Sequence, residues 1–162
     1  MYAPLQVLDE EHLKVDAQLG GVDQRKIFVL AEKYLPRLGY SKRAHLMNVM
    51  LPGFKKAKMS SSDDHSKISL LDSASTIQCK ITKAFCEPAN VTSNALLSIA
   101  KHIIFPSGQQ IHCKDSSAAV VTFSNYEKVE EAYTAMKIHP GDLKDALAIC
   151  LQNLLKPIRA QC

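Results

Sequence analysis

The sequence contains no Cys-x-x-Cys pair, no apolar run of membrane-spanning length and no basic segment followed by a long apolar one at its start. The first absence argues against zinc and dithiol redox sites, and the other two argue against a membrane anchor and a signal peptide. We therefore expect a cytoplasmic protein without a membrane partner, whose thiols mostly pack as small hydrophobic side chains. The five cysteines are odd in number and scattered: Cys79, Cys86, Cys113, Cys150 and Cys162.

The composition is that of an ordinary globular protein. Of the 162 residues 46% are hydrophobic, so one domain or two small ones can bury a core without disulfides or metals. The formal charge of +4 permits an anionic partner but does not require one.

The first part of the chain mixes helical and strand patterns. Polar and apolar residues alternate between Leu13 and Leu19, which is typical of a strand, and Gly20-Gly21 interrupts the pattern. The order of elements predicts a parallel α/β arrangement. The expected elements are a helix over 3–11, a strand over 13–19, a helix that Asp23 caps and Pro36 ends, and a strand over 44–50.

The second part is mainly helical, and the character changes near Lys67, so we place a domain boundary at about 66–70. Ser124 and Glu127 have the spacing of a capping box before a helix. The expected elements are helices over 75–85 and 93–105, strands over 110–113 and 119–123, a helix after Ser124, and a last helix from Pro140 that buries Leu143, Leu147, Cys150, Leu151, Leu154 and Ile158.

Two polar clusters stand out in the first part. Tyr2, Gln6 and Asp9 have the i, i+4, i+7 spacing of one helical face, which also fits a plain solvated helix. The run Gly20-Gly21-Val22-Asp23-Gln24 leads into a helix N-terminus, where backbone amides and the helix dipole favour an anion. A Gly-Gly pair before a helix is also a common connection.

A loop rich in lysine and serine follows the Pro52-Gly53 break. It reads Ala57-Lys58-Met59-Ser60-Ser61-Ser62-Asp63. Lysine supplies a mobile positive charge, and serine hydroxyls and amides donate to phosphate oxygens, so the loop suits a polyphosphate. Serine-rich loops are also commonly nothing more than solvated loops.

Taken in order, these pieces resemble the eukaryotic and archaeal tyrosyl-tRNA synthetases. The resemblance continues through Ala84-Phe85-Cys86-Glu87-Pro88 and His139-Pro140-Gly141-Asp142-Leu143-Lys144 to Pro157-Ile158-Arg159, and covers nearly the whole chain. The related tryptophan enzymes share the glycine turn and the lysine–serine loop, but they are not expected to carry the tyrosine–glutamine–aspartate face.

The resemblance implies that the chain uses ATP to activate tyrosine and transfers it to tRNA-Tyr. Asp9 would accept a hydrogen bond from the substrate phenol. Magnesium would come with ATP, without a metal site in the protein. The implied site residues are Tyr2, Gln6, Asp9 and Gln24 for tyrosine; Gly21, Asp23, Lys58 and Met59 for ATP and the adenylate; Lys58, Ser60 and Ser61 for the charge on pyrophosphate; and His139 and Asp142 for the anticodon.

The resemblance also implies a domain organisation. A partial Rossmann-like catalytic domain would cover 1–67, and a mainly α-helical anticodon-binding domain would cover 68–162. No His-x-Gly-His motif of the family occurs, so we expect the carboxyl-side half of an enzyme that is a homodimer when intact. The alternative is a non-catalytic tRNA-binding or protein-interaction fragment. Asp115-Ser116-Ser117-Ala118-Ala119 stands where the family has an aromatic-Gly-Gly segment.

Overall fold

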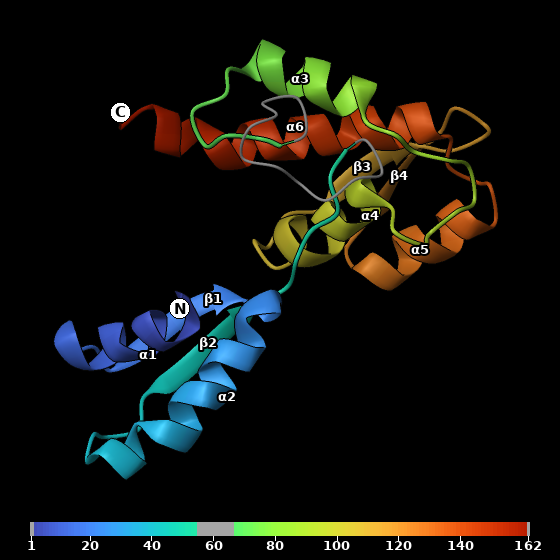
Figure 1. Cartoon of the computed structure of the whole chain (residues 1–162). Coiled ribbons are helices and arrows are strands. Elements are labelled where there is room, and N and C mark those ends of the chain that lie inside the picture. Colours follow the sequence, from blue (N-terminus) through green and yellow to red (C-terminus); the bar gives the residue numbers. More distant parts are fainter. Residues whose placement is uncertain (1, 55–66, 162) are drawn as a thin grey trace. The chain divides into compact units, whose positions relative to one another are not determined.

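The computed structural model describes residues 2–54 and 67–161. They form two compact units, one of residues up to Met50 and the other from Leu51 onward (Figure 1). Both units contain helices and strands, so the mixed α/β class expected from the sequence is confirmed. The assignment of residues 1–67 to a catalytic domain and of 68–162 to an anticodon-binding domain stays a prediction.

The first unit is a strand–helix–strand arrangement preceded by a helix. Its elements are α1 (Tyr2–His12), β1 (Ala17–Gly21), the 3-10 turn η1 (Val22–Gln24), α2 (Arg25–Tyr34), the 3-10 turn η2 (Pro36–Leu38) and β2 (Ala44–Asn48). β1 and β2 pair in parallel, and α2 is the crossover that such a pair needs. Val7 of α1 packs with Ala31 and Leu35 of the α2 region to form a small core.

The expected strand over 13–19 was predicted to start too early. Lys14 has a left-handed backbone with φ 54°, and the Val15 N–H donates to the Glu10 carbonyl over 3.3 Å. These are features of a helix end, where the last carbonyls find partners beyond the final turn. The alternation around Leu13 therefore belongs to the cap of α1, and β1 begins only at Ala17.

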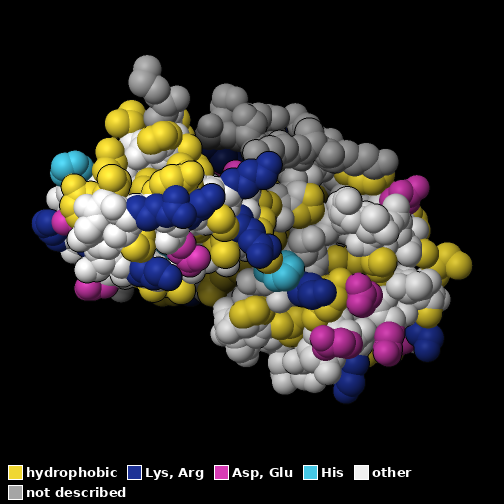
Figure 2. Space-filling view, turned by 60° about the horizontal axis from the view of Figure 1, so that its bottom comes forward, with side chains coloured by type: hydrophobic (Ala, Val, Ile, Leu, Met, Phe, Trp, Pro, Cys, Tyr) yellow, Lys and Arg dark blue, Asp and Glu magenta, His cyan; other side chains and the backbone are white. Residues whose placement is uncertain are grey.

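One side of the two-stranded sheet exposes apolar residues. Leu19 lies opposite Leu46 across the strands, and their side chains are 73% and 56% exposed. Figure 2 shows hydrophobic side chains, in yellow, at the surface among Lys and Arg side chains in dark blue. Parallel sheets are normally covered on both faces, so an exposed apolar pair marks a face suited to contact with other polypeptide.

The second unit is built around its last helix. Its elements are α3 (Ala74–Lys83), α4 (Ala95–Ile99), the π-helical η3 (Ala100–Ile104), β3 (Ile111–Lys114), β4 (Val120–Phe123), α5 (Tyr126–Thr134) and α6 (Pro140–Arg159). α3 runs alongside α6, and the antiparallel β3–β4 pair also packs on α6 (Figure 1). β3 and β4 confirm the two strands expected over 110–113 and 119–123.

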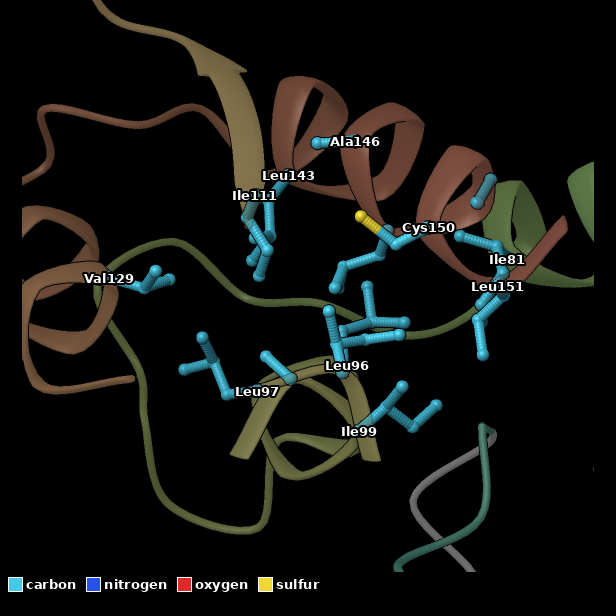
Figure 3. Close-up of a cluster of buried hydrophobic side chains, with 14 of the residues drawn as sticks. Ile81, Leu96, Leu97, Ile99, Ile111, Val129, Leu143, Ala146, Cys150 and Leu151 are labelled. Carbon is cyan, nitrogen blue, oxygen red and sulfur yellow. The ribbon is translucent and has the colours of Figure 1, made fainter. Parts of the chain in front are cut away.

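Ten labelled side chains in Figure 3 outline the core of this unit. They come from α3, α4, β3, α5 and α6, and all are at most 5% exposed. Burying a leucine or isoleucine side chain contributes about 1.5–3 kcal/mol, so this cluster is the main source of stability of the unit. The labelled residues are Ile81, Leu96, Leu97, Ile99, Ile111, Val129, Leu143, Ala146, Cys150 and Leu151.

The helix expected over 93–105 is divided into an α-helical and a π-helical part. Asn94 caps α4, because its Oδ1 accepts from the N–H groups of Leu96 and Leu97 at 3.0 and 3.2 Å. The chain then passes into η3, whose wider turns change which side chains face the core.

Two local expectations in the second unit are wrong. Asn125, not Ser124, caps α5, since its Oδ1 accepts from the Lys128 N–H at 3.2 Å. On α6 the expected buried residue Ile158 is 38% exposed, whereas Leu155 is 5% exposed. Steps of four residues along the helix place Leu155, and not Ile158, on the core face.

A polar cluster fixes the segment that leads into α3. Lys80 Nζ donates to Asp72 Oδ2 over 2.6 Å, and the Ser69 N–H donates to the same oxygen over 2.9 Å. Arg159 Nη1 donates to the Asp72 carbonyl over 2.6 Å, which ties this segment to the end of α6. The Lys80 side chain is only 8% exposed, so Asp72 neutralises a nearly buried charge.

Opposing effects act on the pKa of Asp72. Partial burial raises it, but the hydrogen bonds from Lys80 and Ser69 and the charges of Lys80 and Lys67 outweigh burial and hold the pKa below its ordinary value. A carboxyl group with a lowered folded-state pKa stabilises the fold above its unfolded pKa, and this stabilisation is lost as the pH falls through the folded pKa.

Replacing Asp72 with asparagine should therefore have a pH-dependent effect. At neutral pH we expect Asp72→Asn to lower the free energy of unfolding by about 1–3 kcal/mol, because Lys80 loses its charged partner. The difference from the unchanged chain should shrink below about pH 4, where the carboxyl becomes protonated. Urea unfolding at a series of pH values measures this.

The control is Asp145→Asn. This exposed carboxylate accepts a hydrogen bond from Gln78 Nε2, at 3.0 Å. We expect its effect on unfolding to stay within about 0.5 kcal/mol. An Asp72→Asn effect that persists undiminished to pH 2 would contradict the assignment.

Candidate functional site

The glycine turn at the end of β1 is packed too closely for larger residues. A Cβ on Gly20 would lie 2.7 Å from Gln24 Oε1 and 2.9 Å from Phe28 Cζ. A Cβ on Gly21 would collide with Asp23 Oδ1. Gly21 has an ordinary extended backbone, φ −74°, so the close approach of neighbouring groups is what favours glycine there.

The side chains of Gln6 and Gln24 meet at this turn. Gln6 Nε2, on α1, donates to Gln24 Oε1, on η1, over 2.9 Å. Gln6 Oε1 is buried without a hydrogen-bond partner in the described part of the chain, and so is Gln18 Oε1 on β1. Buried polar atoms normally have partners, so these two oxygens are candidate acceptors for a ligand that donates hydrogen bonds.

Tyr2 and Asp9 lie on the same helix as Gln6 but at the surface. The Tyr2 side chain is 73% exposed, and Asp9 is also exposed. Within residues 2–54 the structure thus brings Gln6 and Gln24 together at the glycine turn and leaves Tyr2 and Asp9 open to a ligand or to further polypeptide.

A hollow of about 510 Å³ lies beside the turn, at the start of α2. It is lined by Val22, Asp23, Arg25, Lys26 and Val29. Two cationic side chains therefore stand next to Asp23 at a helix N-terminus, an arrangement that favours an anionic ligand group.

The sequence reasoning missed a buried polar pair in this unit. His45 Nε2 donates to Glu10 Oε1 over 2.9 Å, and neither side chain is more than 5% exposed. The His45 ring stacks on Phe28, with ring centroids 4.6 Å apart, and Phe28 is the ring that Gly20 approaches. The pair therefore holds the side chain against which the glycine turn packs.

One signal for this pair was present in the sequence. Glu10 stands three residues after the buried Val7, a spacing that places both on the inner face of α1. Charged residues are seldom buried without a partner, so a glutamate on that face calls for a donor such as His45.

His139 and Asp142 lie at the start of α6 in the second unit. His139 caps the helix, since its Nδ1 accepts from the Gly141 N–H at 3.1 Å. Both residues line a pocket of about 480 Å³, within the range of ligand pockets, about 300–1,000 Å³. The other lining residues are Pro88, Lys114, Asp115, Ser116, Ala118, Met136, Ile138 and Pro140.

The segment 115–119 makes a tight turn at the edge of this pocket. Asp115 Oδ1 accepts from the Ser117 N–H, the Ser117 hydroxyl and the Ala119 N–H at 2.9, 2.6 and 3.0 Å. These bonds, above all the one from the Ser117 hydroxyl, outweigh partial desolvation and lower the pKa of Asp115. At neutral pH the pocket therefore carries a carboxylate at this position.

The remaining expected site residues, Lys58, Met59, Ser60 and Ser61, lie outside the described residues. In residues 2–54 and 67–161 there is no group of three His, Cys, Asp or Glu side chains that could hold a metal ion. None of the helices in those residues has the length and apolar character needed to cross a membrane.

Comparison with known proteins decides the family. Residues 1–156 match the model of the tRNA synthetases class I (W and Y). The chain belongs to this family. Among curated class I synthetases, the cytoplasmic tyrosine–tRNA ligase of Danio rerio is 53% identical over 161 residues, which are 98% of this chain and 30% of the relative.

Other class I synthetases agree with this match. The probable cytoplasmic tyrosine–tRNA ligase of Encephalitozoon cuniculi is 49% identical, over 99% of this chain and 49% of the relative. The tyrosyl-tRNA synthetase of Archaeoglobus fulgidus, solved in complex with L-tyrosine, has a TM-score of 0.87 and 39% identity, over 99% of this chain and 50% of that chain. The chain thus spans half or less of the length of these synthetases.

In this class I synthetase chain, Glu10→Ala should destabilise the first unit. His45 would lose its buried acceptor, and we expect the unfolding free energy of the unit to fall by about 1–3 kcal/mol. The neighbouring Glu11, which pairs with Lys14 and with Arg43 at 2.9 Å, provides the control. Glu11→Ala should cost less than Glu10→Ala, because Lys14 is 74% exposed and the Arg43 guanidinium keeps its hydrogen bond to the Ser41 carbonyl.

Urea unfolding followed through the amide resonances of β1 and α2 distinguishes the two variants. Equal losses for Glu10→Ala and Glu11→Ala would show that the Glu10–His45 pair has no special role in this synthetase.

Proposed function

We propose that the chain is the carboxyl-side part of a tyrosine–tRNA ligase, with a Rossmann-like catalytic portion over 1–67 and a helical anticodon-binding portion over 68–162. The single observation that carries the proposal is the Gln6–Gln24 bond at the glycine turn, with an unpartnered acceptor beside it. The exposed Leu19–Leu46 pair supports the view that further polypeptide completes the sheet.

The acceptors around the turn suit the α-ammonium group of an amino acid. An ammonium group is donor-only, and the buried Gln6 Oε1 is an acceptor without a donor. Tyr2 and Gln24 complete this part of the proposed site. Asp9, one turn further along α1, would accept from the phenol hydroxyl of tyrosine, and a phenylalanine in that place would leave the carboxylate unpaired.

The adenylate would lie along the glycine turn. Gly21 lets the ligand approach the backbone, and Asp23 accepts from ribose hydroxyls. Lys58, Ser60 and Ser61, with the backbone near Met59, would surround the β- and γ-phosphates of ATP. ATP carries its own Mg²⁺, so the protein would not need a set of side chains that holds the metal.

The proposed reaction needs no nucleophile from the protein. The tyrosine carboxylate attacks the α-phosphate, a new P–O bond forms, and pyrophosphate leaves as the old P–O bond breaks. Donors from Lys58, Ser60 and Ser61 stabilise the charge that develops on the leaving group. A ribose hydroxyl of tRNA-Tyr then attacks the carbonyl carbon of the adenylate and releases its proton to solvent. The bond between this carbon and the phosphate oxygen breaks, and AMP leaves with its electron pair.

The pocket at the start of α6 suits an RNA base. The ring of His139 is available for stacking, while its Nδ1 is used in the helix cap. The Asp142 carboxylate, in the same pocket, can accept from the N–H groups of a guanine edge. We assign anticodon contact to this pocket.

The intact enzyme is proposed to be a homodimer in the cytoplasm. The location rests on the names of the vertebrate and microsporidian relatives, both called cytoplasmic. Its partners would be tyrosine, ATP and tRNA-Tyr.

A second candidate function, RNA binding without catalysis, is favoured by one contrast between the sites. The pocket around His139 is lined by residues of the second unit alone, whereas Tyr2 and Asp9 of the first unit are exposed. Binding of tRNA by the chain without aminoacylation would support this alternative for the polypeptide by itself.

Pyrophosphate exchange tests the first proposal. The full-length gene product should exchange pyrophosphate into ATP when tyrosine is added, and not when tryptophan is added. Exchange that depends on tryptophan, or no exchange at all, would overturn the assignment.

Asp9→Ala in the same product should lower kcat/KM for tyrosine about 10- to 150-fold, because a hydrogen bond to a charged group is lost. Since Asp9 is exposed, we expect the unfolding free energy of the chain to change by less than about 0.5 kcal/mol. Comparable losses of stability and of tyrosine use would identify Asp9 as a structural carboxylate.

Asp142→Asn should weaken discrimination at the anticodon. An amide offers a donor where the carboxylate offers only acceptors, so the preference for guanine should fall by about 1–3 kcal/mol, or about 5- to 150-fold. Aminoacylation of tRNA-Tyr and of a version with the first anticodon base changed provides the comparison. His139→Asn, which retains a helix-capping side chain, separates capping from stacking.

A further inference from the structure

Met136 occupies an unusual position at the end of α5. Its backbone is left-handed, with φ 55°, and the following N–H, of Lys137, donates to the Ala132 carbonyl over 2.9 Å. The Met136 N–H donates to the Tyr133 carbonyl over 3.0 Å. This pair of bonds is the Schellman helix end, where glycine is the usual residue because a Cβ is disfavoured.

The side chain of Met136 is 69% exposed and lines the pocket at the start of α6. Ile138 and Pro88 line the same pocket, so part of its wall is apolar. A flexible, polarisable thioether adapts its shape to a flat ring and makes favourable sulfur–aromatic contacts. Met136 has a strained backbone and contributes nothing to the buried core. Its side chain is therefore placed where a ligand can contact it.

The charged side chains that line the pocket limit the class of ligand that it can bind. Asp115 and Asp142 contribute two carboxylates, against the single lysine Lys114. Carboxylates repel phosphate and accept hydrogen bonds, so the pocket suits a neutral ring that carries N–H donors. A nucleobase has these properties, with a flat face for the thioether and an edge for a carboxylate.

We propose that Met136 is a specificity-determining residue of this pocket, and that its thioether packs on the face of an unstacked base in the anticodon loop. This inference rests on the proposed tRNA binding. It also accounts for the segment 115–119, which provides a hydrogen-bonded turn and no aromatic ring at the pocket edge. Met136, from another part of the chain, supplies the apolar surface.

Met136→Gly tests the inference without the usual risk of unfolding. Glycine is better suited than methionine to a left-handed backbone, so the melting temperature of the variant should be equal or higher. The affinity for a hairpin RNA whose loop carries the anticodon GUA should fall about threefold to tenfold with loss of the sulfur contact. Fluorescence anisotropy at one fixed salt concentration measures it, since phosphate contacts depend on salt.

Two matched variants complete the design. Met136→Leu keeps an apolar side chain of similar size and should bind the hairpin within about twofold of the unchanged chain. Ser93 also has a left-handed backbone, with φ 54°, and does not line the pocket. Ser93→Gly should therefore relieve the same kind of strain without any effect on RNA affinity.

Abasic hairpins identify the contacted base. If Met136 packs on one base, then removing that base should abolish the difference between the unchanged chain and Met136→Gly, because the two changes remove the same contact. Hairpins that lack each anticodon base in turn provide the comparison.

The outcomes separate the two proposals. Hairpin binding that is equal in the unchanged chain and in Met136→Gly overturns the role of Met136 and leaves tRNA binding intact. No binding by the unchanged chain overturns both. A difference that persists with every abasic hairpin shows that Met136 acts through the phosphate backbone or the fold, and it overturns base contact.

Discussion

Parallel pairing of β1 and β2 is the constraint on which the first unit depends. A parallel pair cannot be closed by a tight turn, so α2 must begin almost where β1 ends and carry the chain back. The connection then passes so close to Gln24 and Phe28 that Gly20 has no room for a Cβ. The same path brings Gln24 within hydrogen-bond distance of Gln6, so the candidate ligand site follows from the way the two strands are joined.

In the second unit the main constraint lies at the start of the long buried helix α6. His139 caps α6 with one ring nitrogen, and its ring still lines the pocket. Ile138, just before the cap, is buried against the core and also lines the pocket, as does Asp142 in the first turn. The helix cap and the proposed base contact thus use adjacent atoms of the same residue.

The order and type of most elements could be predicted from the sequence, because apolar spacing and Gly or Pro breaks mark them. The left-handed residues Lys14 and Met136 could not, since neither residue type signals that backbone. The burial of Glu10 was missed because a charged residue on a short amphipathic helix suggests a solvated face. In the candidate sites, Gln6 and Gln24 were expected together. The position of Met136 at the pocket depends on how the chain turns after α5, which local sequence patterns do not describe.

The two-stranded sheet has a practical consequence. In the described residues β1 and β2 each leave one edge without a neighbouring strand, and Leu19 and Leu46 add an apolar face to that open backbone. Open edges recruit strands from other molecules, and this tendency grows with the number of molecules in solution. For purified material, association should therefore increase with the protein concentration, and dilute conditions would keep the chain dispersed.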